Sequence, residues 1–419
     1  MHTGSRATPN LMRRVNRGGV LKCILTREEN TRVGIAEALC LTKTTLTNIV
    51  ADMIEGGILM ETSGGRQANR LGRKSVSLEL SPRAPAICGL LVKRRRICAI
   101  IGAMDGRILE RITYALDSDL TMETFRNKLG EIFLRIMERA SQPVFAVSVA
   151  AIGPIDCDAG IILRPTDFYR ETADFPLREF LESLTDLPIF FTHDSSAAAY
   201  AEHLYDNAAG QDTFLFLSLE AGISGGLCLD GRIYNGMFGR SGEIGHTSIR
   251  YDGEVCKCGN RGCLELYAGM NAMLRSAEAY RRFLPEHPIF REPMDIHQVI
   301  LSADAGDALC QELLGEYCAY LAHALCNVIT LLNIRTIYVG TPVEAANHVF
   351  ESLLSERLNE RIGPLAETQA QVFPSALGVE AALYGTIAAV MEQVFEGMFF
   401  PFEQVVDPAP NGARSNIQA

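Results

Sequence analysis

Residues 242–265 read GEIGHTSIRYDGEVCKCGNRGCLE, and this stretch carries the strongest chemical signal in the chain. Cys256, Cys258 and Cys263 lie within eight residues, separated by glycines that permit a tight turn, and His246 lies ten residues before Cys256. Three thiolates and one imidazole complete the tetrahedral coordination of Zn²⁺ and leave no position open for water. The pattern therefore predicts one structural zinc ion per chain, the alternative being three unrelated reduced cysteines.

Two stretches upstream predict strands that end in polar turns. Residues 143–156 read PVFAVSVAAIGPID, a buried strand before a Gly-Pro turn, and residues 187–205 read LPIFFTHDSSAAAYAEHLY, a strand before an alanine-rich helix. Asp194 lies where that second strand ends, so its carboxylate can accept a hydrogen bond, or a proton, from a ligand hydroxyl. The alternative is that Asp194 or Ser195 only caps the helix.

Further acceptor groups follow in the chain. Residues 214–236 predict antiparallel strands around a Gly-rich turn, and Glu243, His246 and Glu265 come after them. These side chains are candidates to join Asp194 around one cleft. Carboxylates and an imidazole supply the acceptors that the hydroxyls of a sugar require, so the set favours a carbohydrate site.

The first 83 residues differ in charge from the remainder. They contain thirteen Lys and Arg against seven Asp and Glu, a net charge of +6, whereas the whole chain carries −11 and its remainder therefore −17. A basic module on an acidic body favours contact with DNA by one end only. The length of 419 residues predicts two or three domains.

The basic module has the pattern of a helix-turn-helix. Residues 11–26 predict a first helix, and a short turn leads to a second. A third helix is predicted to follow, with Thr42 as a candidate N-cap and Gly56-Gly57 as a candidate stop. Its apolar side chains recur at helical spacing and form one buried stripe, which consists of Leu46, Ile49, Val50, Met53 and Ile54. The outward face, where a recognition helix meets base edges and phosphates, carries Lys43, Thr44, Thr45, Thr47 and Asn48.

A hairpin completes this module. Residues 58–61 and 75–80 predict two strands, joined by the Gly- and Arg-rich tip SGGRQANRLGRK. Such a tip is typical of a wing that reaches phosphates or a minor groove, here with Arg66, Arg70, Arg73 and Lys74. The alternative is a small helical protein-interaction module with a solvated basic loop.

The cysteines and the apolar segments bear on the compartment. The chain has twelve cysteines and opens MHTGSRATPN, without an apolar signal segment, so we expect a cytoplasmic protein with reduced thiols. Residues 317–334 lack formal charges but include His323, Asn327 and Asn333. They predict a helix buried in the protein core and no membrane insertion.

From roughly Leu11 to Val390 the chain resembles the ROK family (repressors, open reading frames and kinases), and specifically its repressor branch. The motifs that carry the resemblance are the helix-turn-helix with its GRK wing end, AIGPID at 151–156, HD at 193–194, GEIGH at 242–246 and CKCGNRGCLE at 256–265. The resemblance implies an actin/hexokinase-like (ribonuclease H-like) fold of two α/β lobes around a cleft. It also implies that zinc is held by His246, Cys256, Cys258 and Cys263.

The resemblance assigns roles in the cleft as well. Asp194 corresponds to the catalytic base of the kinases, and Glu243, His246 and Glu265 correspond to residues that contact the sugar. His193 stands where the kinases carry Asn, as in some repressors, and completes the set of effector-binding candidates.

Departures from the kinase pattern bear on function. The phosphate turn Asp-x-Gly-Gly-Thr of the kinases corresponds here to Leu91–Arg95, and their Gly-Thr-Gly turn corresponds to Glu220-Ala221-Gly222. A third pair near the nucleotide is Gly340-Thr341. Glycine lets backbone N–H groups approach phosphates, whereas Lys and Arg side chains obstruct them and a carboxylate repels them. We therefore expect no catalytic residues and no kinase activity.

The basic run from Lys93 to Arg96 has two interpretations. It is either a solvated hairpin tip between two strands or an anion site for a sugar phosphate. The solvated tip is the prediction that the charge pattern favours.

The sequence thus predicts an α/β protein with an N-terminal winged helix-turn-helix and a two-lobed ROK body. The expected divisions are a DNA-binding domain over 1–83, a first lobe over 84–200 plus 380–403, a second lobe with the zinc loop over 201–379, and a disordered tail over 404–419. The expected function is a sugar-responsive repressor, a homodimer or tetramer on operator DNA whose effector is a sugar or sugar phosphate. The alternatives are an ATP-dependent sugar kinase with a regulatory head and a repressor released by a sugar-transport protein.

Overall fold

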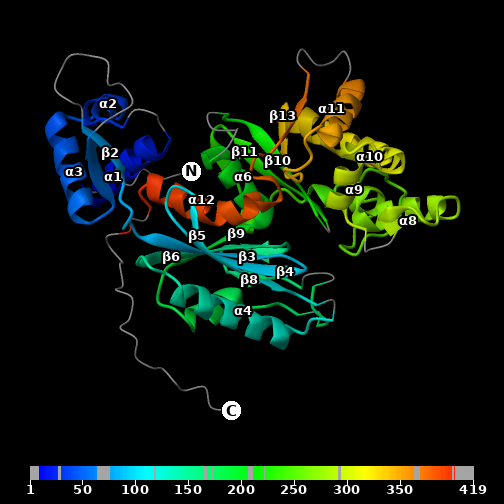
Figure 1. The fold of residues 1–419 in the computed structure, drawn as a ribbon, viewed down its shortest axis with the longest axis horizontal. Coiled ribbons are helices and arrows are strands. Elements are labelled where there is room, and N and C mark those ends of the chain that lie inside the picture. The colour runs from blue at the N-terminus through cyan, green and yellow to red at the C-terminus, as the bar shows by residue number, and fades with distance from the viewer. Residues whose placement is uncertain are drawn as a thin grey trace.

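The N-terminal part of the chain forms three helices and a hairpin (Figure 1). The computed structural model describes residues 9–26, 30–63, 76–117, 119–164, 168–171, 173–205, 211–220, 222–290, 294–362, 369–398 and 401. The helices are α1 (Pro9–Thr26), α2 (Arg32–Ala38) and α3 (Lys43–Glu55). Strands β1 (Leu59–Ser63) and β2 (Val76–Leu80) pair antiparallel, with Leu59 opposite Leu80. The expected order of elements in this module is confirmed.

Helix α3 forms for the local reasons that its sequence predicts. The Thr42 side chain accepts a hydrogen bond from the Thr45 backbone N–H at 3.1 Å, which satisfies one of the donors at the helix start. The helix ends before Gly56, and Gly57 has a φ of +72° that suits glycine. Its buried residues are Leu46, Ile49, Val50 and Met53, so four of the five stripe positions are in the core and Ile54 lies at its edge.

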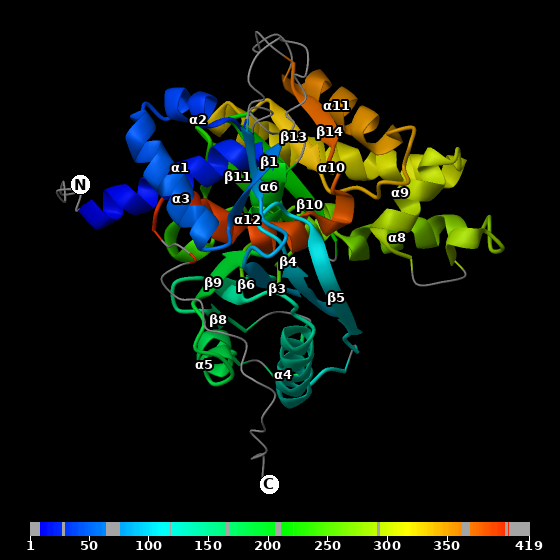
Figure 2. The same ribbon diagram turned by 60° about the vertical axis from the view of Figure 1, so that its left-hand side comes forward.

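The first large sheet has strand order β5-β4-β3-β6-β9. Its strands are β3 (Ala86–Val92), β4 (Arg96–Gly102), β5 (Ile108–Ala115), β6 (Val144–Ala151) and β9 (Ile189–His193). Strands β3, β6 and β9 are parallel. After β6 comes a short antiparallel hairpin whose strands, β7 (Ile155–Asp156) and β8 (Ile161–Ile162), have two residues each. Helices α4 (Met122–Glu138) and α5 (Leu177–Glu182) cover one face (Figure 2).

The second large sheet has strand order β12-β11-β10-β13-β14. Its strands are β10 (Phe214–Leu219), β11 (Ile223–Leu229), β12 (Arg232–Tyr234), β13 (Thr336–Val339) and β14 (Gln371–Pro374). The helices beside it are α7 (Glu265–Ala268), α8 (Met270–Arg281), α9 (Ile296–Asp304), α10 (Ala308–Leu332) and α11 (Val349–Ile362). Short 3₁₀ turns lie at Met237–Gly239, Ile244–His246, Pro288–Phe290 and Gly378–Glu380.

Two helices lie between the sheets. Helix α6 (Asp194–Tyr205) packs against β10 and β11 of the second sheet, and α12 (Ala381–Phe395) packs against β3 and β6 of the first. The two helices also pack on each other over most of their length (Figure 1). A displacement of α6 would therefore act directly on α12.

Helix α10 matches the apolar stretch over 317–334. Tyr317, Leu321 and Leu325 belong to the core of the second sheet, so the prediction of a buried core helix is confirmed. Within the described residues, the helices are all too short or too polar to cross a membrane.

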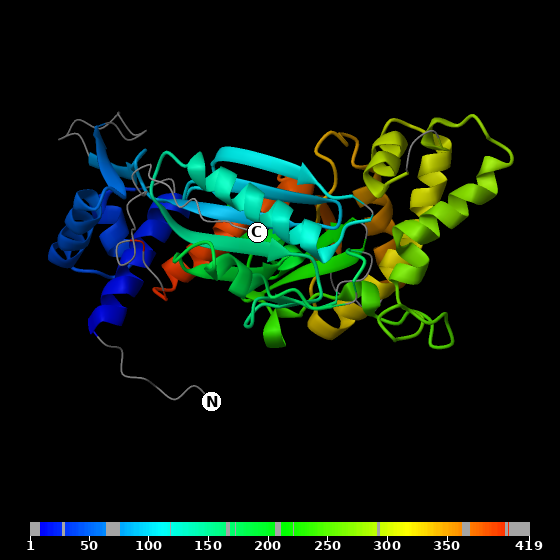
Figure 3. The same ribbon diagram turned by 90° about the horizontal axis from the view of Figure 1, so that it is seen from below.

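The N-terminal module shares its core with the body. Helix α1 packs on the last turn of α12, and a Cβ added at Gly18 would collide with the Val394 carbonyl oxygen and lie 2.6 Å from that of Phe395. The glycine in the middle of α1 is therefore explained by close backbone approach. Figure 3 shows the resulting elongated molecule, with the blue N-terminal helices at one end and the yellow-green helices at the other.

Candidate functional site

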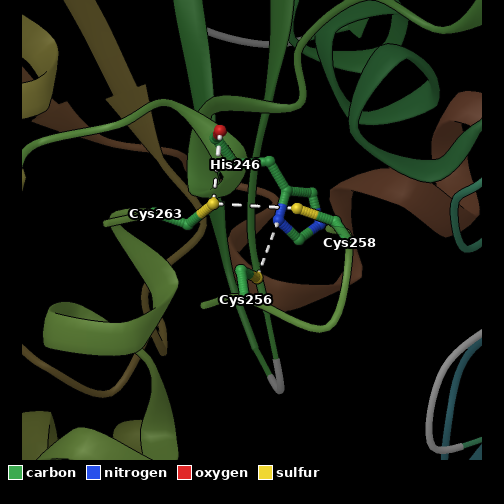
Figure 4. A group of neighbouring side chains, drawn as sticks. All are labelled: His246, Cys256, Cys258 and Cys263. Atoms are coloured by element: carbon green, nitrogen blue, oxygen red, sulfur yellow. Dashed lines mark hydrogen bonds between the residues drawn. The ribbon is translucent and has the colours of Figure 1, made fainter. Parts of the chain in front are cut away.

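The four predicted zinc ligands converge on one point (Figure 4). Their ligand atoms all lie within 4.8 Å of one another. The Cys258 and Cys263 sulfurs are 3.7 Å apart, and the Cys256 sulfur is 3.7 Å from His246 Nδ1. Ligands of a tetrahedral zinc at about 2.3 Å lie about 3.8 Å from each other, so this donor set fits the ion in both chemistry and spacing.

The backbone of this loop explains why the ligands can meet. Gly262 has a φ of +64°, and a Cβ there would collide with the Arg250 carbonyl oxygen. The Asn260 amide donates to the His246 carbonyl oxygen at 3.1 Å, which ties the two ends of the loop together. Isolated bridges pair Ser248 with Cys263 and Val255 with Arg261. The predicted role of glycine in turning the loop is supported by this geometry.

His193, Asp194 and Glu243 form a connected group. His193 closes β9 and Asp194 opens α6, as the sequence predicts, and both side chains are buried. His193 Nδ1 lies 3.1 Å from Asp194 Oδ1, and its Nε2 lies 3.7 Å from Glu243 Oε1. A Cβ at Gly153 would lie 2.6 Å from Glu243 Oε1 and 2.7 Å from His193 Nε2, so the AIGPID turn leaves room for this group.

His246 and Glu265 lie close to the 3₁₀ turn of Ile244–His246, which directly follows Glu243. Glu265 begins α7, and its Oε2 would be 2.9 Å from a Cβ at Gly222 and 3.4 Å from one at Gly245. His246 ends the turn that Glu243 begins, and its Nδ1 faces the cysteine sulfurs. The 3₁₀ turn thus connects the metal ligands with the acceptor carboxylates.

Lys93 overturns one expectation. The hairpin tip between β3 and β4 exists, but Lys93 is only 3% exposed, so the prediction of a solvated side chain is wrong for this residue. Its ammonium lies 2.7 Å from Asp194 Oδ2 and 3.2 Å from Glu220 Oε1. Two carboxylates hold it in the interior because a buried charge is tolerated only when it is paired. The same pairing argues against Lys93 as part of an anion site.

The pKa values of this group follow from its contacts. Burial opposes the charged form of Asp194, but the Lys93 ammonium and His193 outweigh it, so the pKa of Asp194 lies below its ordinary value. Burial also opposes the charge on Lys93, but Asp194 and Glu220 outweigh it and raise the pKa of Lys93. Lys93 and Asp194 are therefore both ionised at neutral pH.

The three stretches that the sequence analysis compares with the nucleotide turns of the kinases meet at this point. Lys93, Glu220 and Gly340 each belong to one of these stretches, and they line one common space. That space has a volume of about 10 Å³. A single water molecule needs roughly 10–15 Å³, so this space has room for about one water molecule.

Sequence reasoning missed the ion pair between Lys93 and its partners. A usable signal was present, because in this alignment Lys93 stands at a glycine position of one phosphate turn and Glu220 at a glycine position of the other. Opposite charges at two positions that a shared fold brings together indicate a pair.

The candidate DNA contacts on α3 are mostly exposed. Lys43, Thr44, Thr47 and Asn48 are exposed, whereas Thr45 is half-buried and its hydroxyl lies 2.8 Å from that of Thr42. Thr45 is thus engaged in the helix cap. The four predicted wing contacts, Arg66, Arg70, Arg73 and Lys74, lie outside the described residues, as does the tail over 404–419.

Comparison with known proteins shows which family and which relatives the chain is similar to. The ROK family pattern matches residues 89–393. The xylose repressor of Bacillus spizizenii is 25% identical over 394 residues, which cover 93% of this chain and 98% of that protein. The structure of a ROK family transcriptional regulator, a homolog of the E. coli MLC protein, has a TM-score of 0.76 at 23% identity and covers 93% of this chain and 98% of its own.

A kinase structure shares the fold of the body. The ROK family glucokinase from Streptomyces griseus, in complex with glucose and AMPPNP, has a TM-score of 0.63 at 24% identity. The match covers 74% of this chain and 99% of the kinase, and at this identity it shows the fold alone. Since the family pattern covers well over half of the residues, the chain belongs to the ROK family.

Proposed function

We propose that this chain is a sugar-responsive, DNA-binding repressor whose cleft is a receptor and not a kinase active site. The observation that carries the proposal is the position of Lys93. Its ammonium fills the junction between the residue that matches the kinase base, Asp194, and the altered phosphate turn at Glu220. A nucleotide phosphate would have to displace a paired, buried cation, and the space beside it holds about one water.

The N-terminal module is the proposed DNA reader. Helix α3 buries its apolar stripe and leaves Lys43, Thr44, Thr47 and Asn48 exposed, which is how a recognition helix enters a major groove. We assign residues 1–83 to this winged helix-turn-helix, with Arg66, Arg70, Arg73 and Lys74 on the wing. A homodimer would place two such helices on two half-sites of an operator in the cytoplasm.

The cleft is the proposed effector site, between a first lobe over 84–200 plus 380–403 and a second over 201–379. His193, Asp194, Glu243, His246 and Glu265 would accept hydrogen bonds from the hydroxyls of a sugar. A zinc ion on His246, Cys256, Cys258 and Cys263 would have a structural role, because the four donors leave no open position. It would fix the turn that bears Glu243 and the start of α7.

Helices α6 and α12 supply the coupling between the two sites. Asp194 opens α6, α6 packs on α12, and the end of α12 contacts Gly18 of α1. A sugar that binds one arrangement of the cleft more tightly would shift these helices and change the spacing of the two DNA-reading heads.

The test measures operator binding with and without sugar. DNA fragments that the protein itself selects from a genomic pool would be labelled, and affinity would be followed by fluorescence anisotropy with pentoses, hexoses, amino sugars and their phosphates. We expect at least one sugar to change operator affinity tenfold or more. The E243Q/E265Q variant should bind DNA like the wild type but lose this response. If no carbohydrate changes the affinity, the sensor function is wrong.

A kinase with a regulatory head is the second candidate, and the shared fold with the glucokinase favours it. A coupled assay with ATP and the same sugars separates the two. We expect no turnover above background. Turnover that disappears in a D194N variant would replace the receptor with an enzyme.

A further inference from the structure

A second cavity lies at the free edge of the first sheet. It has a volume of about 360 Å³, in the range of roughly 300–1,000 Å³ that is typical of small-molecule pockets. Strands β6 and β9 form its floor, and Tyr200 of α6 and Gln393 of α12 line its upper wall. None of the five effector candidates is among the described residues that line it.

One polar group on the floor of this cavity lacks a partner. Ser148 lies in β6, between Ala146 and Ala150 on the same face, and is fully buried. Among the described residues its hydroxyl has no hydrogen-bond partner. Leaving a buried hydroxyl unpaired destabilises a protein, and such groups in native structures call for an explanation. Since Ser148 lines the cavity, a ligand hydroxyl can supply the missing partner.

The other polar groups around the cavity are mostly neutral. The Tyr200 hydroxyl accepts a hydrogen bond from the Asn235 amide at 3.2 Å, and Thr192 and Gln393 add a hydroxyl and an amide. Such groups both donate and accept, as the hydroxyls of a sugar or polyol do. Phe190 and Phe191 provide apolar surface for the C–H face of a ring.

Arg178 is the only cation among the described residues that line the cavity, and it is already engaged. The Arg178 guanidinium donates to the carbonyl oxygens of Asp158 and Ala159 at 3.3 Å and lies 4.7 Å from the centre of the Phe191 ring. The carboxylate of Asp158 lines the same cavity. With one acid beside one engaged base, this lining favours a neutral ligand over a phosphate or another anion.

We propose that this cavity is a second binding site, distinct from the cleft, for a neutral polyhydroxylated ligand of monosaccharide or disaccharide size. Gln393 lies directly before Val394, whose carbonyl oxygen abuts Gly18 of α1. Occupancy is therefore expected to stiffen the turn of α12 that carries the N-terminal module. This coupling rests on the proposed function, whereas the binding itself does not.

The test uses saturation-transfer NMR with D-xylose, D-glucose and sucrose as probes. The E243Q/E265Q variant removes acceptors of the cleft, and S148A and A389L change the floor and wall of the cavity. We expect at least one probe to bind the cleft variant like the wild type, and S148A and A389L each to weaken that binding tenfold or more in the E243Q/E265Q background. The melting temperature of S148A should be unchanged or higher, because the unpaired hydroxyl is gone.

A matched control is S77A in β2, which removes another buried hydroxyl without a partner among the described residues, at a position that does not line the cavity. It should leave probe binding unchanged. The proposal is overturned if no probe binds the cleft variant, or if S148A and A389L leave binding unchanged in the E243Q/E265Q background. Loss of the operator response in E243Q/E265Q concerns only the cleft, so the two proposals fail separately.

Discussion

Replacing Lys93 with Met tests the buried ion group directly. The substitution keeps an apolar stem of similar length but leaves the carboxylate of Asp194, 9% exposed, without its 2.7 Å partner and Glu220 without its 3.2 Å partner. Removing one member of a buried ion pair costs about 3–5 kcal/mol, because the remaining charge is buried alone. For a body of this size the loss corresponds to a melting temperature lower by about 5–8 °C.

The pH dependence of this loss has a definite sign. The pKa of Asp194 lies below its ordinary value in the folded protein. Its stabilising contribution is thus present at neutral pH and disappears as the pH falls through about 3.9, the ordinary pKa, and below. The K93M variant lacks this contribution, so the gap to the wild type should be widest at neutral pH and should narrow as the pH falls below about 4.

Calorimetry at pH 7 and near pH 3 measures both effects. The K93R variant is the control that keeps the charge, and the K93M/D194N double variant should recover part of the loss because the orphaned carboxylate is gone. If the K93M protein melts within about 1 °C of the wild type at pH 7, the pairing of Lys93 with Asp194 and Glu220 does not stabilise the folded protein. A deficit that is independent of pH would refute the role of Asp194.

Three further predictions concern the other sites. Metal analysis should find one zinc per chain in the wild type; the C258S variant should lose this ion and melt earlier, whereas C40S should keep it. The K43A variant should weaken binding to all DNA sequences and reduce the salt slope of binding by about 1, as measured by anisotropy. The G18A variant should uncouple the N-terminal module from α12 and lose the sugar response, because its added Cβ would collide with the α12 backbone at Val394. The G19A variant is the control and should respond normally, because its Cβ meets only the end of the Leu39 side chain at 3.2 Å.

The features that could be predicted from the sequence depend on residues that lie close together in the chain. The start, end and buried stripe of α3 depend on Thr42, Gly57 and an apolar repeat, all within one helix. The zinc loop likewise draws its four donors from eighteen consecutive residues. Both were predicted because caps, glycines and ligand spacing are local features.

What could not be predicted depends on pairs far apart in the chain. Lys93 and Asp194 are 101 residues apart, and a run of basic residues gives no sign that its first member turns inward. Gly18 weakens a helix when α1 is considered alone, and its reason lies in α12, more than 370 residues later. In both cases the tertiary partner decides the environment, and a local pattern contains no information about it.

On the proposed function, the ion group would also explain how one fold can keep a sugar site and lose the kinase chemistry. A general base is most effective when its pKa lies near the working pH, whereas the Lys93 ammonium keeps the pKa of Asp194 below its ordinary range. Such a carboxylate is a poor proton acceptor but still a good hydrogen-bond acceptor. Its Oδ1 lies beside His193 Nδ1, while its Oδ2 faces Lys93. A sugar hydroxyl that donates to this group would therefore be held without being deprotonated, which is what a receptor requires.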